Sequence, residues 1–374
     1  MLNFKRPPWR SDETLGEYME RTGVSRREFL TYCGELAALL GLSTTMVPKV
    51  AEALQTARRA SVIWLQFQGC TGCVESLLRT ESPTIGDVVL RQISLDYLRT
   101  IQAAAGDAAM DAARKAAEEN RGRYILAIEG AIPTKDGGIY DCAAGVTARH
   151  ELEEFLPGAA AVLAVGACAH FGGWPAAKPN PTGAVGVPAL VKDKPLVVIA
   201  GCPPIGDVIT ATIAHYLMFG RLPEVDLQFR PKFAYGARIH DQCPRRANFD
   251  AGQFVETFDD PAARLGWCLY KVGCKGPETF SPCPLINWNG TTKWPIASGH
   301  PCFGCTEPFF WDSMFPIYKR LPQVAGFSVE RTADTIGAAI AAGVTAGVAA
   351  HAIATGVQKA RQKKAAAGGP EEGS

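Results

Sequence analysis

The sequence predicts an α/β protein in which a doubly wound parallel sheet is followed by a smaller, loop-rich region. Four apolar, β-branched runs between residues 61 and 200 alternate with helical stretches, as the buried strands of a parallel sheet do. From about Arg230 onward, Pro, Gly, Trp and Cys dominate, and regular periodicity nearly disappears. A chain of 374 residues is long enough for two such domains with tails.

The four expected strands are short runs bounded by Gly and Pro. They span residues 61–68 (SVIWLQFQ), 124–132 (YILAIEGAI), 160–167 (AAVLAVGA) and 195–200 (PLVVIA). The clearest helix between them covers residues 101–120, which are rich in Ala, Glu, Lys and Arg. We therefore expect the α/β domain over residues 58–230 and the loop-rich domain over residues 231–330.

The first 57 residues have the pattern of an export leader. Ser25-Arg26-Arg27-Glu28-Phe29-Leu30 matches the twin-arginine pattern, and an uncharged, weakly apolar stretch follows over residues 36–47. That stretch is too short to span a bilayer, so it resembles the apolar region of a signal peptide. The small residues Ala51, Ala53 and Ala57 offer cleavage sites. The alternative is an ordinary Arg-Arg pair on a surface helix.

Residues 331–374 are predicted to form a membrane-anchor helix and a basic tail. Residues 335–357 carry no charge, and as a helix they would be about 34 Å long, enough for a hydrocarbon core of about 30 Å. The basic residues after them place the C-terminus in the cytoplasm, which leaves the rest of the protein outside. These residues are Lys359, Arg361, Lys363 and Lys364. The alternative is an Ala-rich soluble helix.

Ten of the twelve cysteines and one histidine fall into three sets. The first set is Cys70, Cys73, Cys168 and Cys202; the second is His240, Cys243, Cys268 and Cys274; the third is Cys283, Cys302 and Cys305. Three of the expected strands lead directly into a cysteine of the first set. Because ligands bind at the carboxyl ends of the strands in open α/β sheets, these cysteines are expected to converge at one edge.

Sets of four, four and three ligands indicate two 4Fe–4S clusters and one 3Fe–4S cluster, and hence electron transfer. Pro295 and Pro301, in the loop of the third set, cannot supply a fourth ligand. One alternative is a secreted binding protein stabilised by zinc or disulfides, although three cysteines form a poor closed zinc site. The net charge of +1 gives no electrostatic case for nucleic-acid binding.

These motifs together resemble the small, electron-transferring subunit of membrane-associated nickel–iron hydrogenases. The matching segments are CTGC (70–73), GAC (166–168), GCPP (201–204), IHDQC (239–243), GWCLYKVGCKGPE (266–278), SPCP (281–284) and GHPCFGC (299–305). The leader and the apolar tail match as well. The resemblance implies a flavodoxin-like N-terminal domain and a C-terminal domain that holds two clusters.

The resemblance also implies a role for each set. The first set would hold the proximal 4Fe–4S cluster, the third the medial 3Fe–4S cluster and the second the distal 4Fe–4S cluster. Hydrogen would be oxidised at the Ni–Fe site of a large subunit, and electrons would leave to a membrane cytochrome b or another quinone-linked acceptor. The protein would lie on the periplasmic face of the cytoplasmic membrane. The pattern Gly343-x-x-x-Gly347 is compatible with a dimer of heterodimers.

Four residues lie outside this scheme or depart from the family pattern. Oxygen-tolerant members carry extra cysteines where this chain has Gly72 and Gly173, so we expect an ordinary proximal cluster and an enzyme inactivated by oxygen. Cys142 is interpreted as a structural thiol, and Glu75 as either a proton relay or a carboxylate at a helix N-terminus.

A subunit related to the quinone-reducing module of respiratory complex I is the alternative within electron transfer, but it lacks the second and third sets.

Overall fold

The computed structural model describes residues 13–81, 84–87, 93–288, 293–314, 318–319 and 329–367. The chain divides into two compact units, residues 1–320 and 321–374. The first unit contains the α/β domain and the loop-rich region. The second contains one helix.

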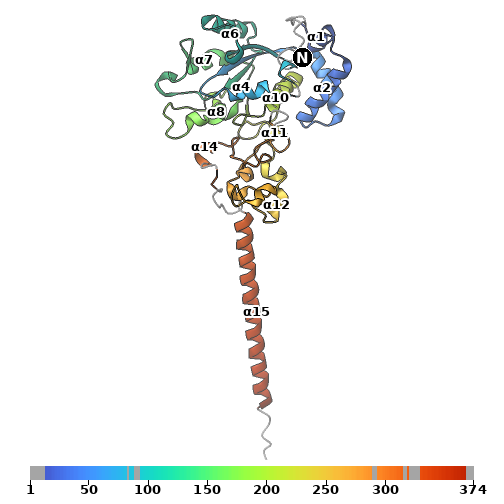
Figure 1. Ribbon diagram of the computed structural model, residues 1–374, viewed down its shortest axis with the longest axis vertical. Helices are drawn as coiled ribbons and strands as arrows, with labels where there is room; N and C mark the ends of the chain where they lie inside the picture. The colour runs from blue at the N-terminus through green and yellow to red at the C-terminus, as the bar shows by residue number, and fades with distance from the viewer. Residues whose placement is uncertain are drawn as a thin grey trace, which may run out of the picture. The chain divides into compact units, whose positions relative to one another are not determined.

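A five-stranded parallel sheet forms the centre of the first unit (Figure 1). Its strands are β1 (Ala60–Gln66), β2 (Ile93–Leu98), β3 (Ile125–Glu129), β6 (Ala161–Val165) and β7 (Leu196–Ile199). Their order in the sheet is β2-β1-β3-β6-β7, which is the doubly wound, flavodoxin-like order. The four predicted strands and the predicted fold class are confirmed.

The edge strand β2 was not predicted from the sequence. Its central residues Ser94, Leu95 and Asp96 are half-buried, whereas β3, β6 and β7 are buried at every position. A half-exposed edge strand with polar residues lacks the continuous apolar run by which the others were predicted. A two-stranded antiparallel ribbon, β4 (Cys142–Ala143) and β5 (Val146–Thr147), follows β3.

Helices connect the strands of the sheet. The longer ones are α4 (Gly72–Leu78), α6 (Asp107–Glu119), α7 (Ala148–Phe155), α8 (Gly166–Phe171) and α10 (Gly206–Phe219). Short helical turns are α5 (Ile85–Asp87), η3 (Arg99–Ile101), η4 (Lys135–Gly138), η5 (Leu156–Gly158), η6 (Trp174–Ala176) and α9 (Val187–Leu190). Helix α6 packs against β1 and β2, whereas α4 packs against α10. The helix expected over residues 101–120 begins later, at Asp107.

The described residues before β1, from Glu13 onward, form three helices, of which α2 and α3 pack on α10 and α1 packs on α3. These are α1 (Leu15–Arg21), α2 (Arg26–Leu39) and α3 (Val47–Thr56), with a 3₁₀ turn η1 (Thr44–Met46) before α3. They share one hydrophobic cluster with Ala211, Ala214 and Met218 of α10. The twin-arginine pair lies exposed in the first turn of α2, where Ser25 and Glu28 form a capping box. The structure thus places the pair at the start of a surface helix.

The region after α10 is built from very short helices and loops. They are α11 (Lys232–Tyr235), η7 (Ile239–Gln242), α12 (Arg246–Asp250), α13 (Pro261–Arg264), η8 (Tyr270–Val272), η9 (Gly276–Glu278) and α14 (Phe310–Ser313). Within its described residues, pairing between extended segments is limited to isolated bridges such as Arg238–Phe280 and Phe254–Cys268. The predicted loop-rich character is therefore confirmed.

The second unit contains helix α15 (Val329–Ala367). Its stretch Gly337–Lys363 contains an 18-residue window with a mean hydropathy of 1.6 and is long and apolar enough to cross a membrane. The 18-residue window that defines this stretch is not buried within the structure. The uncharged run 335–357 predicted from the sequence lies inside this helix.

Candidate metal centres

The four cysteines of the first set meet at the carboxyl edge of the sheet. Cys70 follows β1, Cys168 lies in α8 directly after β6, and Cys202 follows β7. Cys73 lies on α4, within electrostatic reach of the other three thiols. Thiols separated by more than 130 residues are thus brought to one site, as the order of strands predicted.

Glycines allow the close approach of these thiols. A Cβ placed on Gly166 would lie 2.3 Å from Cys73 Sγ, and one placed on Gly173 would lie 2.3 Å from Cys168 Sγ. A Cβ on Gly72 would lie 3.1 Å from Cys70 Sγ. Gly166 and Gly173 also have positive φ angles, which glycine adopts without strain. The site therefore requires glycine, which has no side chain, at these positions next to its sulfur atoms.

Glu129 is a buried carboxylate in the first site that sequence reasoning missed. It ends β3, and its Oε1 accepts a hydrogen bond of 3.1 Å from the backbone N–H of Cys73. Burial raises the pKa of Glu129, and the hydrogen bond from Cys73 opposes that rise. The available signal was a lone charged residue at the end of an otherwise apolar strand, YILAIE.

The second set surrounds a cavity in the loop-rich region. His240, Cys243, Cys268 and Cys274 all line this cavity, together with apolar neighbours such as Ile239 and Tyr270. The backbone N–H of Arg245 donates to Cys243 Sγ, and that of Gly276 donates to Cys274 Sγ, both at 3.4 Å. The His240 ring packs edge-on against Phe249 at 4.5 Å between centroids. All four predicted ligands of this set thus face one cavity.

The third set lines a second, separate cavity. Cys283, Cys302 and Cys305 are all buried there. Ser281 Oγ lies 3.1 Å from Cys283 Sγ, and the backbone N–H of Gly304 donates to Cys302 Sγ at 3.4 Å. Pro295 belongs to the wall of this cavity, and its side chain has no atom that could bind a metal.

The donor chemistry of the three sets fits iron–sulfur clusters. All twelve cysteines lie among the described residues and all are free, which contradicts a disulfide framework. Burial raises the pKa of Cys168 and of Cys268 to about 12 and that of Cys274 to about 11. Thiols so buried become thiolates when a metal supplies compensating positive charge.

The spacing within the sets favours a cluster over a single ion. A structural zinc ion needs its ligands at about 2.0–2.3 Å. In the part of the chain that the structure describes, no three His, Cys, Asp or Glu side chains are arranged to hold one metal ion. The ligands of the second set line one cavity, and those of the third set line another.

The two remaining cysteines and Glu75 are not among the ligands of these sets. Cys142 is exposed on β4, and its Sγ donates to the carbonyl oxygen of Ile139 at 3.4 Å. Cys33 is buried in α2, where desolvation raises its pKa to about 12. Glu75 is exposed in the first turn of α4, the position expected for a carboxylate at a helix N-terminus.

A flavodoxin-like sheet with three cysteine-rich sites, one at its carboxyl edge and two in an appended loop region, defines a class of iron–sulfur electron-transfer proteins. Two family models cover these parts of the chain. Residues 70–216 match the model described as NADH ubiquinone oxidoreductase, 20 Kd subunit. Residues 235–318 match the model of the C-terminal part of the NiFe/NiFeSe hydrogenase small subunit, and this match contains the whole second and third sets.

Whole-chain relatives identify the family. The chain is 47% identical to the uptake hydrogenase small subunit of Azotobacter vinelandii over 351 residues, which are 94% of this chain and 98% of the relative. It is 44% identical to the hydrogenase-1 small chain of Escherichia coli K12, covering 94% of each. The chain belongs to the small subunits of nickel–iron hydrogenases, and the family resemblance inferred from its motifs is confirmed. It acts in a hydrogenase together with a large subunit.

The solved structures agree with this assignment. The chain superposes on a chain of the [NiFeSe]-hydrogenase of Desulfomicrobium baculatum with a TM-score of 0.66 and 36% identity, covering 71% of this chain and all of that one. The actinobacterial-type NiFe-hydrogenase of Ralstonia eutropha H16 gives a TM-score of 0.65 at 25% identity, covering 75% of this chain and 91% of that one. Membership in this family implies iron–sulfur clusters.

Proposed function

We propose that the three sets hold the clusters of an electron-transfer chain. The first set would hold the proximal 4Fe–4S cluster, the third the medial 3Fe–4S cluster, and the second the distal 4Fe–4S cluster. The observation that carries the proposal is the enclosure of two separate cavities by the second and third sets, with three ligands at one and four at the other. Clusters held by Cys thiolates carry single electrons at potentials tuned by hydrogen bonds and exposure.

The first and second sets, which form the two ends of the proposed electron-transfer chain, have different surroundings. At the first set, Cys70 is exposed, and Trp174, six residues after Cys168, is about half-exposed. Tyr140 is also about half-exposed, and its carbonyl oxygen accepts a hydrogen bond from the side chain of Gln68, two residues before Cys70. Exposed apolar groups of this kind favour a protein partner, which we assign as the nickel-containing large subunit. At the second set, His240 and Cys243 are half-buried, and we assign this end as the exit to the acceptor.

The decisive experiment is electron paramagnetic resonance on the air-oxidised, purified heterodimer, with iron and acid-labile sulfide counted on the same sample. We expect the signal of an oxidised three-iron cluster and about eleven iron atoms in this subunit, as two four-iron clusters and one three-iron cluster require. Fully loaded protein without that signal, or with zinc in place of iron, would overturn the assignment.

We further propose that residues 1–57 are a twin-arginine leader and that residues 331–374 anchor the protein on the periplasmic face of the membrane. The α/β domain would then cover residues 58–230 and the cluster-binding domain residues 231–330. The exposed arginine pair of α2 and the apolar stretch of α15 support these assignments. Electrons would pass to a membrane cytochrome b or another quinone-linked acceptor.

Truncation tests the anchor. Deleting the residues after Arg331 should release active heterodimer from membranes, whereas replacing Arg26-Arg27 by Lys-Lys should leave the subunit inside the cell. A truncated protein that sediments with membranes as before would refute the anchor.

The first set also bears on oxygen. Gly72 and Gly173 leave it with four thiolates, so we propose an ordinary proximal cluster and inactivation by oxygen. Sustained hydrogen oxidation in air would contradict this.

A further inference from the structure

Arg230 is a buried arginine between the α/β domain and the loop-rich region. It follows the turn after α10, and its side chain is 4% exposed. Its Nε donates to Asp226 Oδ2 and its Nη1 donates to Glu307 Oε1, both at 2.8 Å. Nη1 also lies 3.3 Å from the carbonyl oxygen of Thr306. One guanidinium therefore joins two carboxylates that are 81 residues apart in the sequence.

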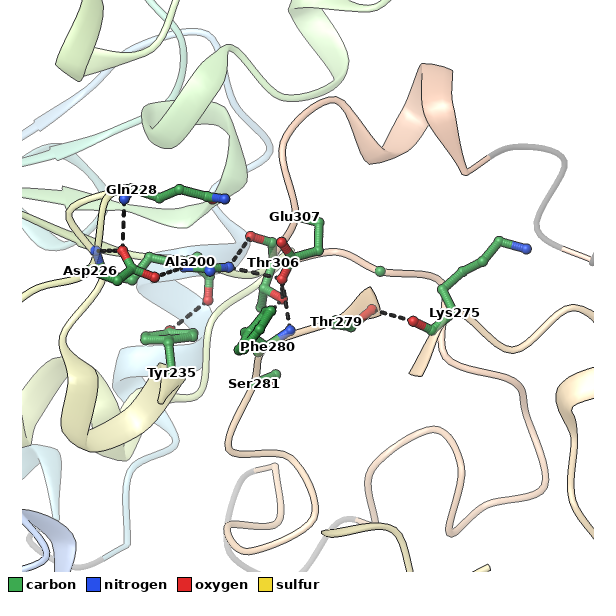
Figure 2. Close-up of polar contacts among 12 residues, drawn as sticks. Ala200, Asp226, Gln228, Tyr235, Lys275, Thr279, Phe280, Ser281, Thr306 and Glu307 are labelled. Atoms are coloured by element: carbon green, nitrogen blue, oxygen red, sulfur yellow. Dashed lines mark hydrogen bonds and ion pairs between the residues drawn. The ribbon is translucent and has the colours of Figure 1, made fainter. Parts of the chain in front are cut away.

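On one side, Arg230 is tied to the strand that leads to the first set. The backbone N–H of Val198, in β7, donates to the carbonyl oxygen of Phe229 at 2.8 Å. The Arg230 guanidinium lies over the ring of Tyr235 at 5.8 Å, and the Tyr235 hydroxyl donates to the carbonyl oxygen of Ala200 at 2.7 Å (Figure 2). Ala200 lies two residues before Cys202, so these contacts fix the loop that carries a ligand of the first set.

On the other side, Arg230 is tied to the third set. Thr306 and Glu307 directly follow Cys305, and both bind the backbone of Phe280 (Figure 2). Glu307 Oε1 accepts from the Phe280 N–H at 2.8 Å, and Thr306 Oγ1 donates to the Phe280 carbonyl oxygen at 2.9 Å. Phe280 leads through Ser281 to Cys283, and its ring packs beneath the guanidinium at 5.5 Å. Two of the three cysteines in this set thus lie beside the network.

The ligands of the two sets are themselves adjacent. Cys202 packs against the hydrophobic cluster that contains Cys305, and the two thiols lie within electrostatic reach of each other. This contact links the first and third sets directly through the chain. Its geometry depends on how the segments 200–202 and 305–307 are held together.

We propose that Arg230 is a positioning residue that holds the Cys305 segment against the Cys202 segment and so sets the rate of electron transfer between the first and third sets. The inference rests on the proposed function of those sets. In each transfer the cluster bound by Cys202 would lose one electron and the cluster bound by Cys305 would gain it. No bond or proton at Arg230 changes. A planar guanidinium fork suits this task because it fixes two carboxylates in direction as well as distance.

The test uses the complete heterodimer with Arg230→Lys, which keeps the charge but loses the fork. Glu307→Gln is the second variant, because it keeps an acceptor for the Phe280 N–H while removing one charge from the network. Arg114→Lys is the matched control, since Arg114 of α6 forms a partly exposed ion pair of 2.7 Å with Glu154 of α7 and is distant in sequence from the ligands. Hydrogen–deuterium exchange between H₂ and D₂O, which needs only the large subunit's site, is measured beside hydrogen-driven dye reduction.

We expect Arg230→Lys to retain its full iron content and its isotope exchange, while dye reduction falls several-fold and the magnetic coupling between the first and third clusters changes. Glu307→Gln should show the same pattern to a smaller degree. If Arg230→Lys loses iron, the proposal is tested with Glu307→Gln instead. Unchanged dye reduction and coupling in fully loaded variants, or an equal loss in Arg114→Lys, would overturn the proposal. Wild-type protein without iron or a three-iron signal would instead refute the proposed function itself.

Discussion

The α/β domain and the loop-rich region after it bury different kinds of side chain. In the α/β domain, strands such as β6 bury every residue, and Val162 and Leu163 have no exposed surface. In the loop-rich region, helices have three to five residues, and the buried positions include five cysteines. Apolar side chains alone form the core of the first, whereas in the second the ligand sets lie among buried apolar side chains such as Leu269 and Trp294.

This difference predicts in which region metal binding should be coupled to folding. A strand domain with a continuous apolar core can be stable before a cluster binds at its edge. The loop-rich region instead places two ligand sets among its buried side chains, so that a bound cluster would become part of its core. We therefore expect the two regions to respond differently to the same perturbation.

Iron removal should have the largest effect. Chelation under reducing conditions is expected to abolish amide-exchange protection over residues 231–314, while strands β1, β3, β6 and β7 keep theirs, because only the former region depends on ligands for its core. Hydrogen exchange followed by mass spectrometry resolves the two regions. Equal loss of protection in both regions would show that they form one cooperative unit and would contradict the expected difference between them.

The next effect concerns the apolar core. Leu163→Ala removes a fully buried side chain from β6 and should lower the free energy of unfolding of the α/β domain by about 2–5 kcal/mol. Denaturant unfolding followed by far-ultraviolet circular dichroism measures this. The three-iron signal should be unchanged under native conditions, so a variant that loses that signal while remaining folded would contradict the separation of the two regions.

Gly173 tests how far the α/β domain can tolerate side chains at its own metal site. Gly173→Ala should reduce iron at the first set, because its Cβ would meet Cys168 Sγ at 2.3 Å. Gly122→Ala is the matched control: it has a similarly positive φ of 77° but no atom within 4 Å of its Cβ. The control should cost about 1–2 kcal/mol of stability from backbone strain alone and keep all its iron. Equal iron loss in the two variants would assign the effect to strain.

Most of the fold and the grouping of the cysteines in space could be predicted because their signals are local. Apolar runs gave four strands, and the cysteines that follow three of them gave the first site. The structure adds what depends on distant partners. Glu129 is buried beside Cys73, 56 residues away in sequence, and Arg230 pairs with Glu307, 77 residues away. A single charged residue has no periodicity that indicates its partner, so only the folded chain reveals these pairs.

The three-ligand set offers the smallest and most specific change. Both Pro295 and Pro301 lie in its loop, but Pro295 is the one that belongs to the cavity wall with Cys283, Cys302 and Cys305. Pro295→Cys should therefore supply a fourth thiolate and raise the iron content by about one atom, with loss of the oxidised three-iron signal. Pro301→Cys adds the same thiol elsewhere in the loop and should keep that signal. Because the fold of the loop-rich region is unchanged, activity with a dye should fall only modestly. A Pro295→Cys protein that retains the three-iron signal would show that the number of thiolates does not determine the type of cluster at this site.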